Sequence, residues 1–424
     1  MRKNPISEFI SPRAASKRLG LSADTLRRWE AAGKINAIRT PTGHRRYDLT
    51  SLVTNSEEVK TSERLIVITE DTIQQIAKGL CDYEQQIPKK SLSDYPAALQ
   101  LGVDKLALAC LTAGVRQPIQ GVSDFVSRWA QLPIKDWDIE IDCPEEWDEQ
   151  KLIEDQKLSN FCIETAGEYF DECGNFQQQV INEIMLKAAK QHELYTNFRC
   201  YLINQPVITR GNLEVDSVMN FKPVKDLLRN SYEKAPESYK KDGKFYCCGH
   251  CGGLMYLNKD DKLKCENKHC AKQKKVTVPF LADTEDEVLW LKKDLRYFIH
   301  RPGKVELMLW ERLKSLNLKE VKLYPELDKY DLHLVFYDET VWAIDVKFWE
   351  SAYNLAKKVD KPITRLKEEP YNESFFVFPD EIQSYGQEYL QEFRSYCSVP
   401  LKKSQVMFES EFIRKVIKKI ESNK

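Results

Sequence analysis

The carboxy-terminal third of the chain shows a helical hydrophobic pattern that is followed by two strand patterns. From Val305 to Leu316, apolar residues recur at helical spacing. Two segments rich in β-branched and aromatic residues come next, Tyr330–Tyr337 and Val341–Phe348, and the residues Asp338-Glu339-Thr340 separate them. We therefore predict a helix and, after it, a β-hairpin.

The second strand of this hairpin carries two charged residues on one face. Because side chains alternate across a strand, Asp345 and Lys347 point the same way as Ala343, while Ile344 and Val346 face the opposite side. An aspartate on a partly apolar face is costly unless it is paired or bound to a metal. The pattern therefore places a carboxylate and an ammonium group side by side.

Four residues in this region are candidates for phosphodiester hydrolysis. That reaction needs a divalent cation to stabilise the attacking and leaving oxygens, and a group that orients or deprotonates the water. Asp331 and Asp345 supply hard oxygen ligands that suit Mg²⁺ or Mn²⁺. Lys347 would hold the nucleophilic water, and Glu306 would orient it or complete the metal shell. Glu311 is the alternative to Glu306.

These residues resemble the motif of the PD-(D/E)XK nuclease superfamily. A helix with Glu306 precedes Tyr330-Asp331, thirteen residues follow, and then comes Asp345-Val346-Lys347, with Tyr330 in place of the motif's proline. A lone D-x-K is frequent on solvated strand faces, so the order of the elements carries this prediction. The wider string, which includes Leu323-Tyr324-Pro325, is similar to the restriction-endonuclease-like proteins encoded beside prokaryotic PIWI-RE proteins in defence islands.

The two resemblances imply a function, a site and partners. They imply a Mg²⁺- or Mn²⁺-dependent DNA endonuclease of a prokaryotic system that defends against phages or plasmids. They also imply work with a PIWI-like protein, a helicase or both. The implied catalytic residues are Glu306, Asp331, Asp345 and Lys347, of which Asp331 and Asp345 bind the metal ion.

The first sixty residues predict two short helices, a tight turn and a β-hairpin wing. Ser11-Pro12 opens a helix that ends at Gly20, and Ser22 caps a second helix that ends at Gly33. The string from Ser22 to Leu52 resembles the MerR-type winged helix-turn-helix, over about residues 8–54. In that family the second helix enters the major groove and the wing contacts the DNA backbone. The resemblance implies DNA contacts, mainly with phosphates, by Thr25, Arg27, Arg28, Arg39, Arg45 and Arg46.

The charge distribution separates a basic end from an acidic segment. Residues 1–60 hold 12 Lys and Arg against 6 Asp and Glu, whereas residues 135–172 hold 3 against 14. The first balance suits phosphate contact and the second repels it. We expect the acidic run Trp137–Glu149 to be a solvated face, although it also has the charge to dock a basic partner or to mimic nucleic acid. A protein-adaptor role for the amino-terminal domain is the alternative to DNA binding.

Cysteine spacing predicts a zinc ribbon. Cys248-x-x-Cys251 and, after thirteen intervening residues, Cys265-x-x-x-x-Cys270 form two pairs. Four thiolates fill a tetrahedral shell, so we predict a structural Zn²⁺ site. The remaining cysteines are mostly scattered singly, which favours buried thiols over disulfides. The alternative zinc ligands are Cys247, His250 and His269.

At 424 residues and 42% hydrophobic content, the chain is long enough for two to four domains. We expect a multidomain α+β protein whose carboxy-terminal core has the element order αβββαβαβα, and whose nuclease domain opens with a helix, Asp283–Phe298. No apolar run approaches the ~20 residues that cross a bilayer, so we expect a cytoplasmic protein without a membrane partner. The predicted domains are a MerR-type winged helix-turn-helix (1–60), a mainly helical scaffold or partner domain (61–240), a zinc ribbon (241–280) and a restriction-endonuclease-like α/β domain (281–424).

Three other functions remain as alternatives. The chain could be a MerR-type regulator or adaptor, a recombinase with the same amino-terminal module, or an inactive nuclease fold kept for binding. The set Asp331, Asp345 and Lys347 argues against a regulator. The lack of a serine-recombinase block or a RuvC-like carboxylate series argues against a recombinase.

Overall fold

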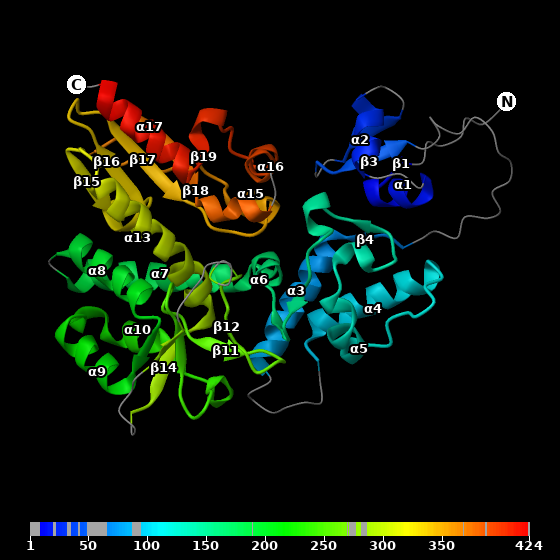
Figure 1. Ribbon diagram of the computed structural model, residues 1–424, viewed down its shortest axis with the longest axis horizontal. Coiled ribbons are helices and arrows are strands. Elements are labelled where there is room, and N and C mark those ends of the chain that lie inside the picture. The colour runs from blue at the N-terminus through cyan, green and yellow to red at the C-terminus, as the bar shows by residue number, and fades with distance from the viewer. Residues whose placement is uncertain are drawn as a thin grey trace. The chain divides into compact units, whose positions relative to one another are not determined.

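The computed structural model forms two compact units, Met1–Gly167 and Glu168–Lys424 (Figure 1). Both units mix helices with strands, and the middle of the chain is mainly helical, so the predicted coarse fold class is confirmed. The four domain boundaries given above stay predictions. The structure describes residues 9–19, 23–31, 35–40, 43–48, 66–86, 95–188, 190–268, 270, 277–280, 286–367, 369–385 and 388–422.

The first unit begins with two helices and a small antiparallel sheet of strand order β1-β3-β2. Its apolar core contains Ala15, Leu26, Ile35 and Tyr47, so one residue from each helix packs against the sheet. Two short helices and a hairpin are what the capping and turn signals of this segment predict. The elements are α1 (Pro12–Leu19), α2 (Ala23–Ala31), β1 (Phe9–Ile10), β2 (Asn36–Arg39) and β3 (Arg45–Asp48).

Helices dominate the rest of the first unit. Helix α3 packs closely on α4, because a Cβ added at Gly79 would lie 2.3 Å from the backbone nitrogen of Leu99. Trp137 and Trp147 of the acidic run are fully buried, so this segment is anchored in the core and is not simply a solvated face. The elements are β4 (Ile68–Thr69), α3 (Glu70–Gln86), α4 (Ala97–Thr112), α5 (Val122–Ser127), β5 (Ile141–Asp142), β6 (Ile153–Glu154), β7 (Lys157–Leu158) and α6 (Asn160–Ala166).

The second unit starts with four helices and a three-stranded antiparallel sheet of order β8-β14-β9. The central strand of this sheet corrects the predicted helix Asp283–Phe298, because Val288–Leu291 is a strand and, from Asp286 onward, helical structure starts at Lys293. The first three residues of the predicted helix, 283–285, lie outside the described residues. All four residues of the strand are buried between two neighbouring strands, and a short apolar run fits a buried strand as well as a helix. The elements are α7 (Glu168–Lys187), α8 (Gln191–Asn204), β8 (Val207–Thr209), α9 (Arg210–Met219), α10 (Lys225–Asn230), β9 (Tyr232–Lys234), β14 (Val288–Leu291), α12 (Lys293–Leu295) and a π-helical turn (Arg296–His300).

A five-stranded sheet of order β15-β16-β17-β18-β19 forms the centre of the carboxy-terminal part. The first two strand pairs are antiparallel and the last two are parallel. The predicted order αβββαβαβα is found, apart from a short turn with left-handed backbone angles, labelled α14 (Pro325–Asp328), between β15 and β16. The other elements are α13 (Arg301–Lys314), β15 (Glu320–Leu323), β16 (Leu332–Val335), β17 (Val341–Val346), α15 (Ala352–Lys358), β18 (Glu373–Phe378), α16 (Tyr389–Tyr396), β19 (Val406–Phe408) and α17 (Glu409–Ser422).

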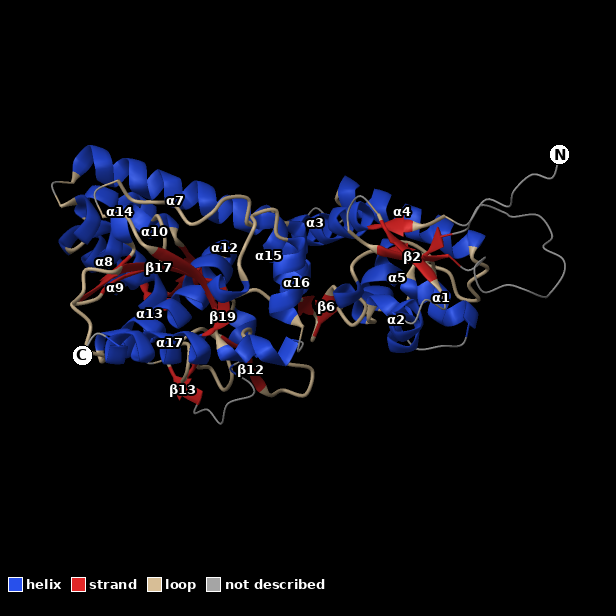
Figure 2. Cartoon of the chain, turned by 90° about the horizontal axis from the view of Figure 1, so that it is seen from above, coloured by secondary structure: helices blue, strands red, loops and turns tan. Residues whose placement is uncertain are grey.

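Helices cover both faces of this sheet (Figure 2). Residues of α13 and α17, among them Leu309 and Phe412, share one apolar core with Ile344 of β17. Residues of α15 and α16 share the opposite core with Ala343. The predicted alternation along β17 is therefore confirmed. Among the described helices, none is both long and apolar enough to span a membrane.

Candidate active site and cysteine centre

Strand β17 delivers Asp345 and brings Lys347 beside it. The Nζ atom of Lys347 lies 2.7 Å from Oδ1 of Asp345, and both side chains are partly exposed. Burial by itself would lower the pKa of Lys347, but the carboxylates of Asp345 and Asp331 outweigh it, so that this pKa lies above its ordinary value. Lys347 is therefore a cation at neutral pH, held next to a carboxylate.

Asp331 lies one residue before β16 and faces the same cluster. Its Oδ2 atom accepts a hydrogen bond of 2.6 Å from the backbone N–H of Val346, and its side chain is buried. Burial and the nearby carboxylates of Glu306 and Asp345 raise the pKa of Asp331 well above its ordinary value. A bound cation would reduce this repulsion between carboxylates that are shielded from water.

Glu306 extends from α13 into the same cluster and is only 2% exposed. Its Oε2 atom accepts a hydrogen bond of 2.7 Å from the hydroxyl of Tyr324, and burial raises its pKa. Glu311, the alternative to Glu306, lies on the exposed side of the same helix and pairs with Lys314. Of the two glutamates, only Glu306 joins Asp331.

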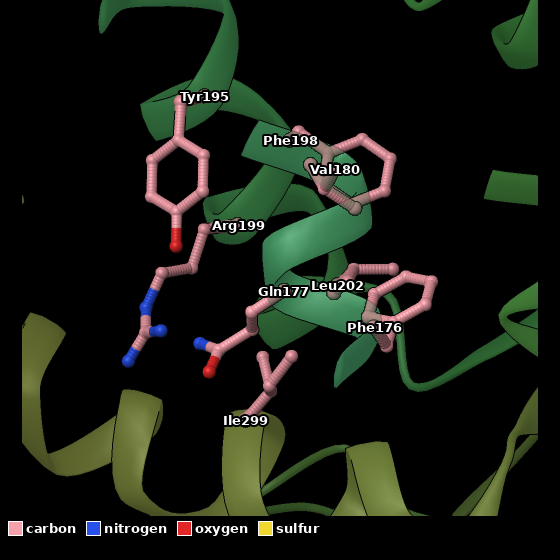
Figure 3. Close-up of a pocket in the computed structure, with 8 residues that line it drawn as sticks. All are labelled: Phe176, Gln177, Val180, Tyr195, Phe198, Arg199, Leu202 and Ile299. Carbon is pink, nitrogen blue, oxygen red and sulfur yellow. The ribbon is translucent and has the colours of Figure 1, made fainter. Parts of the chain in front are cut away.

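A fifth residue, Arg199 of helix α8, completes the cluster and was missed by the sequence prediction. One guanidinium nitrogen donates to both carboxylate oxygens of Glu306, at 3.2 and 3.1 Å, and lies 3.9 Å from Oδ1 of Asp331. The other nitrogen donates to Oδ2 of Asp328 over 2.6 Å, and the Tyr195 hydroxyl donates to the same oxygen over 2.7 Å. Figure 3 shows the guanidinium group pointing away from α8, with the Tyr195 hydroxyl beside it.

The loop that supplies Asp328 has an uncommon backbone. Tyr324, Glu326, Leu327 and Asp328 have φ angles of 50°, 45°, 59° and 72°, in the left-handed region that non-glycine residues rarely adopt. Each such residue costs on the order of 1–3 kcal/mol and persists only where its surroundings hold it. Here Tyr324 is held by Glu306, and Asp328 is held by Arg199. The strain is thus tied to the acidic cluster.

The oxygen donors of this cluster fit a hard divalent cation. Asp331 and Asp345 are the carboxylates beside Lys347, and the Val346 N–H engages only one oxygen of Asp331. Glu306 is engaged by Arg199 and Tyr324. Within the described part of the chain, Glu306, Asp331 and Asp345 do not form a set of three ligand atoms within 4.8 Å of one another. The two aspartates therefore remain the candidates for holding an ion.

The four predicted zinc ligands do come together. The Sγ atoms of Cys248, Cys251, Cys265 and Cys270 all lie within 4.8 Å of one another, and they are the only such group among the described residues. Gly252, with φ of 78°, makes the turn after Cys251. Backbone N–H groups donate to two of the sulfurs over 3.4 Å. The strands around the cluster are β10 (Tyr246–Cys248), β11 (Met255–Leu257), β12 (Leu263–Cys265) and β13 (Thr277–Pro279).

The alternative ligands lie at the edge of this cluster or outside the described residues. The Nδ1 atom of His250 is 3.3 Å from Sγ of Cys270. Cys247 is half-buried and is not part of the group, and His269 lies outside the described residues. A metal centre made of four cysteines is therefore supported, and four soft thiolates suit a structural metal such as zinc.

Four of the six predicted DNA-contact residues have described side chains, and each of these has a partner within the first unit. Arg27 forms an ion pair with Glu145, and Arg46 forms one with Asp142, so two residues of the acidic segment engage basic side chains. Arg45 lies 3.0 Å from Glu30. Arg39 is exposed and donates to the backbone oxygen of Gly43. The side chains of Thr25 and Arg28 are outside the described part.

Three segments of the chain match known protein families. Residues 303–424 match the family described as "REase associating with pPIWI_RE". Residues 72–209 match "pPIWI_RE three-gene island domain Y", and residues 11–47 match "MerR family regulatory protein". The resemblance to PIWI-RE-associated REase proteins with a MerR-type domain is confirmed. Neither the curated proteins nor the solved structures gave a match.

The residues of the acidic cluster come from two of these matched segments. Glu306, Asp331, Asp345 and Lys347 lie in the REase-type segment, while Arg199 lies in the domain Y segment. A sequence signal for Arg199 exists in retrospect. It occupies the apolar stripe of α8 together with Tyr195, Phe198 and Leu202, where an arginine needs a buried partner.

Proposed function

We propose that this protein is a metal-dependent DNA endonuclease of a prokaryotic defence system and that it hydrolyses phosphodiester bonds. One observation carries the proposal. Asp331, Asp345 and Lys347 converge beside Glu306 at one place on the five-stranded sheet, within the segment that matches an REase family. Paired carboxylates with a lysine are the groups that this hydrolysis needs. The sheet and its helices would form a PD-(D/E)XK core.

The residues of the chain divide the chemical work among them. Asp331 and Asp345 would hold Mg²⁺ or Mn²⁺, which when bound supplies Lewis-acid stabilisation of the attacking and leaving oxygens. The Val346 N–H fixes one oxygen of Asp331 and leaves Oδ1 for the ion. Lys347 is a cation, so it would orient the attacking water and stabilise negative charge, and it would not act as a base.

The other parts of the chain would bind and position nucleic acid and partners. The amino-terminal segment would be a winged helix-turn-helix that contacts DNA phosphates through its arginines, of which Arg39 is the most accessible among those described. The four cysteines would hold a structural Zn²⁺ in a ribbon. The names of the matched families support association with a PIWI-RE system, and we propose a PIWI-like protein, a helicase or both as partners in the cytoplasm.

The decisive experiment is cleavage by the full chain with and without Mn²⁺. Duplex DNA, single-stranded DNA and RNA are incubated with the wild type, Lys347→Ala, Asp345→Ala and a matched control, Lys361→Ala. Lys361 lies in the same domain and its side chain is 82% exposed. We expect metal-dependent DNA products from the wild type and the control only. Cleavage by Lys347→Ala at the wild-type rate would overturn the proposal.

A second candidate function is a DNA-binding regulator or adaptor with an inactive nuclease fold. The observation that favours it is the engagement of Glu306, whose carboxylate is held by Arg199 and Tyr324. In that case no variant would cleave any nucleic acid, while duplex binding that weakens with salt would persist.

A further inference from the structure

One side of the acidic cluster is already filled by a cation of the chain itself. The guanidinium of Arg199 donates to both oxygens of Glu306, and the same nitrogen lies 3.9 Å from Oδ1 of Asp331. It thus contacts these two carboxylates, while Lys347 pairs with Asp345. A metal ion bridging Glu306 and Asp331 would have to occupy the place of this guanidinium.

The space beside Arg199 is poorly suited to its charge. Its side chain is 6% exposed, and the hollow beside it is lined mainly by the apolar residues Phe176, Val180, Phe198, Leu202 and Ile299 (Figure 3). Moving the guanidinium into that hollow would leave a charge without partners in an apolar place. Asp328, on the left-handed loop described above, accepts a hydrogen bond from the other guanidinium nitrogen and also one from the Tyr195 hydroxyl. The guanidinium is therefore a fixed part of the site.

The charges of the cluster balance with a single divalent ion. Four carboxylates converge here, and when all four are ionised, as a bound cation favours, the two cations Arg199 and Lys347 leave a net charge of two negative. One divalent ion neutralises this charge, whereas two would leave an excess of two positive charges in a desolvated place. The four carboxylates are those of Glu306, Asp328, Asp331 and Asp345.

We propose that the nuclease site takes one divalent ion, held by Asp331 and Asp345, and that Arg199 excludes a second ion from the Glu306 side. The inference rests on the proposed function and specifies its metal stoichiometry. Glu306 then acts as the anchor of Arg199 and not as a metal ligand. Arg199 is a positioning residue, because it acts through the carboxylates and does not touch the ion.

Counting bound Mn²⁺ tests this assignment without measuring cleavage. Full-length protein purified with its native metal at the cysteine centre is titrated with Mn²⁺ by calorimetry and by electron paramagnetic resonance. The Mn²⁺ ions that bind to the wild type but not to the Asp345→Asn variant are counted as belonging to the site. We expect one ion in the wild type, and two in Arg199→Met, with the spectral broadening of two neighbouring Mn²⁺ ions. Arg229→Gln, which removes a surface arginine paired with Glu214 and Asp226, should keep one ion.

A second variant covers the case in which Arg199→Met does not fold. Glu306→Gln should still bind one Mn²⁺ with an affinity within about threefold of the wild type, because Glu306 is not a ligand in this assignment. A loss of tenfold or more in that variant, or two ions in the wild type, would overturn the inference and leave the proposed nuclease function standing. No ion at the site together with no cleavage would defeat the proposed function itself.

Discussion

The backbone N–H of Val346 donates a hydrogen bond of 2.6 Å to Oδ2 of Asp331. The two residues lie on neighbouring chain segments, β17 and the residue that precedes β16, so the hairpin itself orients this carboxylate. The other oxygen, Oδ1, is left facing the cluster. The sheet therefore fixes the direction of the proposed metal ligand before any ion binds.

The first prediction follows from this hydrogen bond. Asp331→Asn keeps a side-chain oxygen that can accept from Val346, but it removes the charge that would hold the ion. We expect cleavage to fall by at least about 100-fold, while the circular dichroism spectrum stays unchanged. If the Asp331→Asn variant cleaves within about threefold of the wild type, Asp331 is not a ligand. Asn372→Ala, which removes a side-chain acceptor at the other end of the sheet, is the control.

The second prediction concerns the cysteine centre. We expect one zinc per chain in protein purified without chelator, and loss of that zinc with a lower melting temperature in Cys265→Ser. Cys247→Ser is the matched control, because Cys247 is adjacent in sequence to Cys248 and yet outside the cluster. Elemental analysis and thermal unfolding give the result. Zinc retained by Cys265→Ser and lost by Cys247→Ser would mean that the ligand set is different.

The third prediction concerns the basic amino-terminal segment. Arg27 and Arg46 pair with Glu145 and Asp142, so in the proposed DNA-binding role these carboxylates would compete with DNA phosphates. We expect the double variant Asp142→Asn, Glu145→Gln to bind duplex DNA more tightly. The dependence of its affinity on salt concentration should be steeper, by the equivalent of about one to two additional phosphate contacts. Fluorescence anisotropy at several salt concentrations measures both quantities.

The control for the third prediction is Glu149→Gln, which removes an exposed carboxylate paired with Lys135. Equal affinities of the double variant, the control and the wild type would show that the two arginines do not contact DNA.

The fourth prediction is a pH dependence of stability in the first unit. Burial raises the pKa of Asp148 to about 6, although Arg13 acts in the opposite direction. A carboxyl whose pKa is higher in the folded state stabilises the fold below its ordinary pKa, and that contribution is lost as pH rises through about 6. The unfolding free energy of Asp148→Asn, relative to that of the wild type, should therefore rise by up to about 3 kcal/mol between about pH 4 and pH 7. Urea unfolding at several pH values measures it, and a constant difference would refute it.

The fifth prediction contrasts two glycines in helices. At Gly79 a Cβ would meet the backbone of Leu99, whereas at Gly174 it would meet nothing within 4 Å. We expect Gly79→Ala to lower the unfolding free energy by about 1–3 kcal/mol or more through overpacking. Gly174→Ala should raise it by up to about 1 kcal/mol through helix propensity. Denaturant unfolding of both variants is the measurement, and a stabilised Gly79→Ala would contradict the close packing of α3 on α4.

The sequence predicts well those parts of the site whose geometry is local. The alternation of side chains along β17 is enough to place Asp345 beside Lys347. The helical pattern of α13 left Glu306 and Glu311 as alternatives, and the structure shows that Glu306 is the one that faces the cluster. The spacing of the cysteines is likewise a local signal, because each pair lies on one turn.

The parts that the sequence did not predict depend on distant contacts. Arg199 lies 107 residues before Glu306, and only the fold brings α8 to α13. The left-handed loop that carries Asp328 contains no glycine that would signal it. The strand Val288–Leu291 was predicted as a helix, because a buried central strand has no alternating polar positions.

The closeness of α8 and α13 has a consequence for anyone who wishes to recombine such proteins. A Cβ at Gly303, the first residue of the REase-type match, would lie 2.4 Å from the side chain of Ile203, and Arg199 sits one turn earlier on the same helix. A chimera joined at residue 303 would therefore take Glu306 from one parent and its partner Arg199 from the other. The segments that contain α8 and α13 should therefore be transferred together whenever parts are exchanged between relatives.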